Sequence, residues 1–127
     1  MAAIPFFVAQ PVHAATNPRT HYSLSYGTGE YTLKGNLIWY DRTVQVGASL
    51  KATEDNCAMA EYRFFHGSSQ VGEAKRVSCS RTKGHGFRRQ YDQPGGVTRV
   101  AVSLYQSNKN SDWTLLDSAD CTRAGCR

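Results

Sequence analysis

The chain has 127 residues, and its 15 Lys and Arg against 10 Asp and Glu give a formal net charge of +5. This length suits one domain with one hydrophobic core, and no apolar run is long enough to cross a membrane. Aromatic and β-branched residues are frequent and no segment has the apolar stripe of an amphipathic helix, so the patterning excludes a helical protein and predicts an all-β one.

The first residues are apolar. Residues 4–9 are typical of the end of a signal-peptide core, and Val12 and Ala14 put small residues where a signal peptidase cleaves. The positively charged start of a signal peptide is missing. We therefore interpret residues 1–14 as a truncated signal peptide cleaved after Ala14, with an apolar docking peptide or a first strand as alternatives.

The next segment, residues 15–29, is polar and is predicted to be a flexible arm in front of the domain. Tyr22, Leu24 and Tyr26 share one side of an extended strand, which makes them candidate partner-binding residues of this arm. The same alternation fits a first strand of the domain equally well. The folded domain is predicted over residues 30–127.

A β-hairpin is predicted over residues 37–50. Apolar and polar residues alternate strictly from 43 to 53, which indicates a strand with one buried face. The polar pair Asp41-Arg42 joins it to a similar strand upstream and predicts a tight turn. Trp39, just before this turn, is expected to be a core anchor.

A second hairpin is predicted around a turn at residues 66–70. When its strands are folded symmetrically about Ser68, residues equally distant from Ser68 face one another. This register pairs opposite charges twice, Glu61 with Lys75 and Arg63 with Glu73. It also puts Arg76 on the core side, which requires a bulge there or a position at a sheet edge.

The four cysteines are predicted to form two disulfides. The hairpin register brings Cys57 opposite Cys79, within reach of a disulfide. Cys121 and Cys126 then close a short C-terminal loop. Zinc is the alternative, but the chain lacks a CxxC pair, so no metal or cofactor is expected. Disulfides indicate an oxidising compartment, and the protein is predicted to be secreted and extracellular.

Residues 80–96 are basic, with no acid before Asp92, and are predicted to be loops around a short strand at residues 87–91. The candidate polyanion-binding residues are Arg81, Lys83, Arg88 and Arg89, with Tyr91 or Tyr105 as a stacking surface. The simpler interpretation is a solvated cationic loop without a ligand.

Two further strands complete the pattern. Residues 97–105 alternate like a core strand, and residues 113–118 predict a closing strand with Trp113 and Leu115 on one parity. Trp113 is expected to be a second core anchor, with a surface aromatic as the alternative. Seven or eight short strands without a helix predict a single antiparallel β-sandwich, immunoglobulin-like or jelly-roll, stabilised by the two disulfides.

No sequence motif predicts an enzyme. The chain has no nucleophile elbow and no metalloprotease motif, and disulfide pairing leaves no free cysteine. Small secreted ribonucleases are the enzyme alternative, because the chain has residue types suited to acid–base cleavage of RNA, namely His66, His85, Glu61 and Glu73. Both histidines are expected in mobile places, a turn and a glycine-flanked loop. We therefore assign no catalytic residue, and nucleic acid is not an expected partner.

Residues 35–44 (GNLIWYDRTV), followed by residues 61–65 and 97–100, resemble small secreted β-sandwich proteins of Streptomyces over about residues 30–118. The size, secretion and N-terminal arm also resemble the small adaptor subunit of the umbrella toxin particles of Streptomyces. That family implies a non-catalytic linker between a lectin-bearing, trypsin-like subunit and a large helical-repeat toxin subunit.

The first expectation is therefore a secreted, non-enzymatic protein-interaction module, an adaptor in an extracellular toxin-type assembly. The alternative is a binding domain for cell-envelope polyanions or glycans. The two differ in the surface they need, because an adaptor needs a protein-binding arm or sheet edge and a polyanion-binding domain needs clustered cations.

Overall fold

The structure is a computed structural model that describes residues 17–107 and 112–127, so the predicted signal peptide at residues 1–14 lies outside the described residues. No helix among these residues is long and apolar enough to cross a membrane. They form nine strands: β1 (Arg19–Tyr26), β2 (Tyr31–Trp39), β3 (Thr43–Lys51), β4 (Cys57–His66), β5 (Ser69–Cys79), β6 (Thr82–Gln90), β7 (Arg99–Ser107), β8 (Thr114–Thr122) and β9 (Gly125–Cys126).

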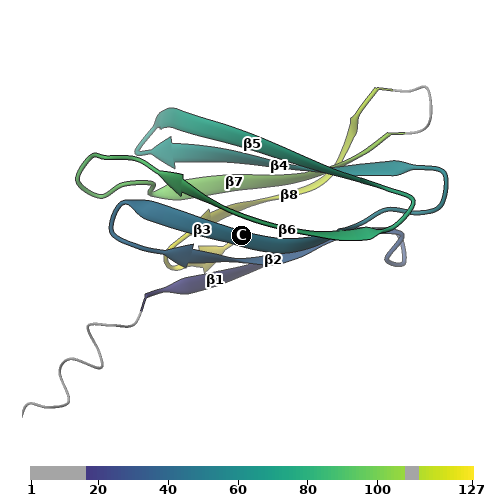
Figure 1. Cartoon of the computed structure of the whole chain (residues 1–127), viewed down its shortest axis with the longest axis horizontal. Helices are drawn as coiled ribbons and strands as arrows, with labels where there is room; N and C mark the ends of the chain where they lie inside the picture. The colour runs from purple at the N-terminus through teal and green to yellow at the C-terminus, as the bar shows by residue number, and fades with distance from the viewer. Residues whose placement is uncertain (1–16, 108–111) are drawn as a thin grey trace, which may run out of the picture.

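The strands form two antiparallel sheets that lie face to face (Figure 1). Sheet A has the order β1-β2-β3-β6, and sheet B has the order β5-β4-β7-β8-β9. This order differs from the immunoglobulin arrangement, because β1, β2 and β3 follow one another as a meander. The prediction of an all-β antiparallel sandwich with two disulfides is confirmed.

The hydrophobic core lies between the sheets and is built from the alternating inward side chains of both. Trp39 is 1% exposed, which confirms it as a core anchor. Its indole Nε1 donates to Thr20 Oγ1 at 3.1 Å, so the buried ring also has its polar atom satisfied. The other largest fully buried side chains are Tyr62, Phe64, Leu33, Leu37, Leu50 and Leu104.

From Cys57 to Phe64 the β4–β5 hairpin has the predicted register, which places Cys57 opposite Cys79 and Glu61 opposite Lys75. Beside the turn, Phe65 and His66 pair one residue off this register, with Gln70 and Ser69. The ion pairs run along each strand, joining Arg63 to Glu61 at 3.9 Å and Lys75 to Glu73 at 3.6 Å. The predicted register is therefore correct for most of the hairpin but not next to the turn.

Arg76 has one of the two positions expected for it, because β5 is an edge strand of sheet B. The hairpin's irregularity lies between Phe64 and Phe65 rather than at Arg76. The Arg76 side chain is half-buried, and its guanidinium carbon lies 4.5 Å from the centroid of the Phe87 ring. A cation–π contact thus accommodates this charge at the border of the core.

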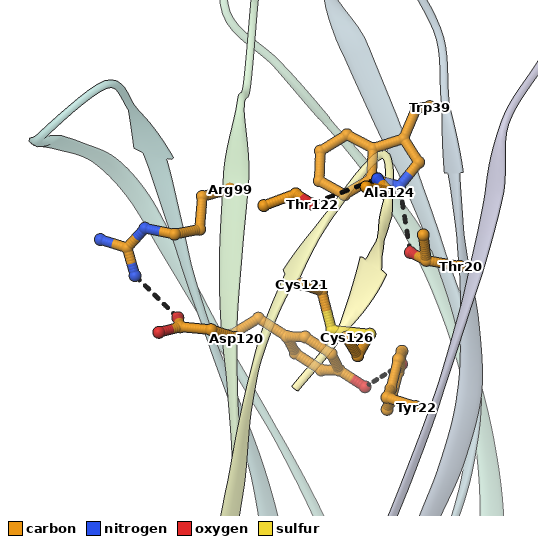
Figure 2. Close-up of a disulfide and its surroundings, with 10 residues drawn as sticks. Thr20, Tyr22, Trp39, Arg99, Asp120, Cys121, Thr122, Ala124 and Cys126 are labelled. Carbon is orange, nitrogen blue, oxygen red and sulfur yellow. Dashed lines mark hydrogen bonds and ion pairs between the residues drawn. A yellow bond between two sulfur atoms is a disulfide. The ribbon is translucent and has the colours of Figure 1, made fainter.

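Both predicted disulfides are present, Cys57–Cys79 and Cys121–Cys126, so no described cysteine is free to bind zinc. Figure 2 shows the second disulfide, Cys121–Cys126, with its loop residues Thr122 and Ala124 and with Trp39. In its loop, Arg123 donates to the Tyr40 carbonyl at 2.8 Å and lies 5.3 Å from the Trp39 ring centroid. The C-terminal loop thereby covers one end of the core.

The prediction of a flexible arm at residues 15–29 is wrong for most of that segment. Residues Arg19–Tyr26 are strand β1, and Tyr22 and Leu24 are each 3% exposed in the core. Their apolar surface is buried against sheet B of the same molecule, so ordering the segment needs no external partner. Of the three candidate arm residues, Tyr26 alone is exposed, at 51%.

The expectation that Trp113 is a core anchor is also wrong, and the alternative of a surface aromatic holds: Trp113 is 40% exposed, and Leu115 on the same parity is 54% exposed. The pairing of β7 with β8 skips Leu116, because Leu104 is opposite Asp117 whereas Tyr105 is opposite Leu115. Such a bulge inverts the side-chain parity. Leu116, not its neighbours, packs against the core.

The basic segment at residues 80–96 is more regular than expected. Most of it is the nine-residue strand β6, which pairs with β3 along its whole length. His85 consequently lies in the middle of a strand and is half-buried, where a mobile loop was predicted. The glycines on either side of it are thus strand residues, and loops begin only after Gln90.

Candidate polyanion-binding surface

The surplus positive charge of the strands lies in sheet A. Its four strands contain six Lys or Arg and no Asp or Glu: Arg19, Lys34, Lys51, Lys83, Arg88 and Arg89. The strands of sheet B contain four of each sign: Arg63, Lys75, Arg76 and Arg99 with Glu61, Glu73, Asp117 and Asp120. One layer of the sandwich is thus basic and the other is balanced.

Side-chain alternation divides these cations between the two faces of sheet A. Four of them point away from the core and are exposed: Arg19, Lys34, Lys51 and Arg88. We call this outer side the cationic face. Arg19 and Arg88 lie in one cross-strand row at opposite edges of the sheet. Three strand spacings separate these edges, about 14 Å.

Glycines form the centre of the cationic face. Gly47 on β3 is paired with Gly86 on β6, and Gly84 lies two residues before Gly86 on the same strand. A side chain at Gly47 would meet no atom within 4 Å, and one at Gly84 or Gly86 would meet only a β3 carbonyl oxygen, at 3.7 and 3.6 Å. Packing inside the fold therefore does not require these glycines. They leave a flat patch of exposed backbone between cations.

Acidic residues reach only the border of this face. Glu30 in the β1–β2 turn lies near Lys51, and its pKa is lowered by hydrogen bonds from its own backbone and from Thr28. Asp117 on β8 accepts from the Ser25 backbone N–H at 3.2 Å, at the edge strand β1. Neither carboxylate comes from a strand of sheet A, so the interior of the face keeps only positive charge.

The four predicted polyanion-binding residues are not brought together on one surface. Arg88 is on the cationic face, whereas Lys83 and Arg89 have the opposite parity on β6, and Arg81 is in the β5–β6 turn. Arg89 donates to the Glu73 carbonyl at 3.0 Å and thus links β6 to β5. Its role in this fold is therefore to join the two sheets.

Sequence reasoning missed three cations of the face, Arg19, Lys34 and Lys51. Each occupies a polar position of an alternating segment, and the segments of β1, β2, β3 and β6 all lack acids. The shared lack of acids in these segments was a sequence signal for a basic layer. The cations form one surface only when β6 is paired with β3, and the order of strands along the chain does not reveal that pairing.

A chain of hydrogen bonds crosses the core beneath this face. Tyr22 Oη lies 2.8 Å from Tyr62 Oη, which lies 2.7 Å from His85 Nε2, so β1, β4 and β6 are connected. Burial raises the pKa of Tyr22 to about 12 and raises that of Tyr62 further. Each hydroxyl has one proton and a neutral imidazole has one donor and one acceptor nitrogen, so the chain is satisfied in either direction.

The pKa of His85 is lowered from 6.5, first by burial and then by the charge of Arg76. The unfolded chain therefore binds a proton at His85 more readily, and stability contributed by the neutral imidazole is lost as pH falls below about 6.5. We expect the difference in unfolding free energy between wild type and His85→Gln to shrink from pH 7 to pH 5. Urea unfolding at both pH values measures it.

A His21→Gln variant is the control for that prediction, because it removes an exposed imidazole on β1 without touching the hydroxyl chain. It should keep the wild-type pH dependence. A His85→Gln variant whose stability difference from wild type is the same at pH 5 and pH 7 would contradict the linkage.

The residue types named for RNA cleavage are dispersed. Glu61 is on the outer side of sheet B, where it accepts from Tyr105 Oη at 3.0 Å, whereas His85 lies between the sheets. His66 Nδ1 is 2.6 Å from the Gly96 carbonyl oxygen, at the end of β4. Within residues 17–107 and 112–127, no group of three or more His, Cys, Asp or Glu could hold a metal ion.

No protein-family model, curated protein or solved structure matches this chain. The resemblance to secreted Streptomyces proteins and to the toxin adaptor therefore stays a prediction. The fold and the surface define a disulfide-stabilised β-sandwich domain with one cationic sheet face. Inferences about its role depend on that geometry alone.

Proposed function

We propose that this protein is a secreted, non-enzymatic binding domain that holds an anionic polymer of the cell envelope against the cationic face. The observation that carries the proposal is that all four strands of sheet A lack acids while its outer side presents Arg19, Lys34, Lys51 and Arg88. Clustered charge of one sign concentrates ligands of the opposite sign and speeds their association.

The shape of the face suits an extended polymer better than a small ligand. It is an open sheet surface, about 14 Å across its four strands. Arg19 and Arg88 lie at its two edges, and Lys34 and Lys51 lie toward one end of the strands. The glycine patch at Gly47, Gly84 and Gly86 lets a flat unit approach the backbone closely. Repeated weak contacts along such a surface add up, as in other multivalent systems.

The two disulfides support the extracellular part of the proposal, because such bonds persist in oxidising compartments. Binding by exposed charges also suits a ligand that is met outside the cell at high local density. Such binding fades as salt rises, since the Debye length falls from about 10 Å at 0.1 M to about 3 Å at 1 M.

The test is retention on immobilised dextran sulfate, with uncharged dextran as the reference column. We expect the double variant Lys34→Gln with Lys51→Gln to elute at lower salt than wild type. Each exposed charge contact is worth roughly 0.2 to 1 kcal/mol, so losing two should weaken binding about 2- to 30-fold. The wild type should pass the uncharged column without retention.

The matched control is Arg63→Gln with Arg99→Gln, which removes the same net charge from sheet B. Both residues already have an acidic neighbour within 4 Å, Glu61 and Asp120 respectively. Elution of this control should stay close to that of wild type. Equal losses in the two double variants would mean that net charge alone governs retention, and the proposal would fail.

A protein-interaction role, as in the adaptor hypothesis, is the second candidate. With Tyr22 and Leu24 in the core, the arm no longer supports it. One other observation favours it: an apolar row crosses the outer side of sheet B at Val77, Met59, Tyr105 and Leu115, and both end residues are exposed. Capture of secreted protein subunits from native culture fluid would support this role, and recovery of this chain alone would count against it.

A further inference from the structure

A small cleft lies where the edge strand β5 of sheet B meets the edge strand β6 of sheet A. It has a volume of about 140 Å³ and is lined by Leu50, Lys75, Arg76, Val77, Lys83, Gly84 and His85. We call it the edge cleft. It borders the cationic face at Gly84, but Lys83 and His85 have the inward parity on β6 and point away from that face.

Positive charge converges on the edge cleft and is only partly compensated. Lys75, Arg76 and Lys83 line it together with His85, and no Asp or Glu does. Lys75 pairs with Glu73 at 3.6 Å. Arg76 and Lys83 have no acidic partner among the described residues.

The Arg76 guanidinium is held in place before any ligand arrives. Its Nη1 donates to the Lys75 carbonyl at 2.8 Å, and its plane lies over the Phe87 ring. The remaining donors of a guanidinium can still bind an oxygen ligand in a fixed, forked geometry. Fixing the donor in advance reduces the entropy lost on binding.

We propose that the edge cleft binds a single tetrahedral divalent oxyanion, phosphate or sulfate. Its volume of about 140 Å³ is several times that needed for a water molecule but too small for a polymer chain. Two full charges on a compact ion match the two unpaired cations, Arg76 and Lys83. This site goes beyond the polymer-binding role and does not depend on it.

His85 couples this site to pH. The charged and titratable groups around His85 are Lys75 and Arg76 on β5 and Lys83 on its own strand, which line the cleft with it, and Tyr62 on β4, whose hydroxyl contacts Nε2. Arg76 is one reason why the pKa of His85 lies below 6.5 in the free protein. A bound dianion offsets that charge and favours the imidazolium, so the pKa of His85 rises on binding and affinity increases as pH falls through the range in which His85 takes up a proton.

The test is NMR titration with sodium sulfate, whose charge is constant from pH 5 to 8, against sodium chloride at the same ionic strength. Sulfate should shift the Arg76, Lys83 and His85 amide signals in a saturable manner and raise the pKa of the His85 imidazole. Lys83→Gln should weaken sulfate binding roughly 2- to 5-fold, as for an exposed contact. Arg76→Gln should weaken it about tenfold or more.

Lys34→Gln, on the cationic face, is the control and should bind sulfate like wild type. Sodium phosphate at pH 8 should give the same shifts as sulfate. Equal shifts with chloride, or undiminished sulfate binding in folded Lys83→Gln, would overturn the proposal. Retention on dextran sulfate is not used here, so the edge cleft and the cationic face can fail separately.

Discussion

Replacing Trp39 with alanine should lower the free energy of unfolding by about 3 to 5 kcal/mol, the usual cost of truncating a buried Trp. The ring is 1% exposed, and its loss leaves a large cavity between the sheets. Thr20 Oγ1 also loses the hydrogen bond from the indole, and Arg123 loses the ring beneath its guanidinium. Urea unfolding followed by circular dichroism measures the change.

The chain provides a control of the same residue type. Trp113 is 40% exposed, so Trp113→Ala should cost no more than about 0.5 kcal/mol, as for ordinary surface substitutions. This comparison also tests the β8 bulge, which places Trp113 outside the core. Similar losses in the two variants would show that the assignment of inside and outside in β8 is wrong.

Removing the Cys57–Cys79 disulfide by alanine at both positions should cost about 3 kcal/mol. The bridge joins residues separated by 22 positions, and closing a loop of that size constrains the unfolded chain by about this amount. Cys79 is exposed and Cys57 half-buried, so little packing is lost with the sulfurs. Urea unfolding without reductant measures the effect.

The variant that removes the disulfide should keep the native far-ultraviolet circular dichroism spectrum, because the β4–β5 register is also held by its turn and by the pairing of β4 with β7. Unreduced peptide mapping of wild type should give one fragment with Cys57 and Cys79. A cost under about 1 kcal/mol would contradict the loop-closure account. A fragment joining Cys79 to Cys121 would contradict the disulfide pairing itself.

Local pattern was sufficient to predict hairpins whose strands are adjacent in sequence. The alternation on either side of Ser68 predicted the register that brings Cys57 opposite Cys79, although a bulge after Phe64 shifts the pairs beside the turn by one residue. Likewise, the polar pair Asp41-Arg42 separates β2 from β3. In these cases all the determining residues lie within about twenty positions, so the sequence contains the necessary geometry.

The predictions were wrong where contacts between distant parts of the chain determine the structure. Whether residues 19–26 are an arm or a strand depends on whether Tyr22 and Leu24 find a partner surface, and sheet B provides it from elsewhere in the chain. In β8, one skipped residue at Leu116 reversed the inward and outward sides. A bulge leaves no periodic signal, so parity alone did not reveal that Trp113 lies outside the core.

The candidate surface shows the same limit. The sequence drew attention to residues 80–96 because their charges are contiguous, yet only Arg88 of that group is on the cationic face. Its other cations come from β1, β2 and β3. Long-range strand pairing assembles them, and the spacing of charges along the chain does not encode that pairing.

Chemical-shift mapping with a short dextran sulfate chain tests the central claim most directly. The account predicts saturable shifts of amides on β1, β2, β3 and β6, largest at Gly47, Gly84 and Gly86, that fade as salt rises. Uncharged dextran of the same length should produce none. Shifts confined to the outer side of sheet B, or no saturable shift at low salt, would contradict the assignment of the cationic face as the polymer-binding surface.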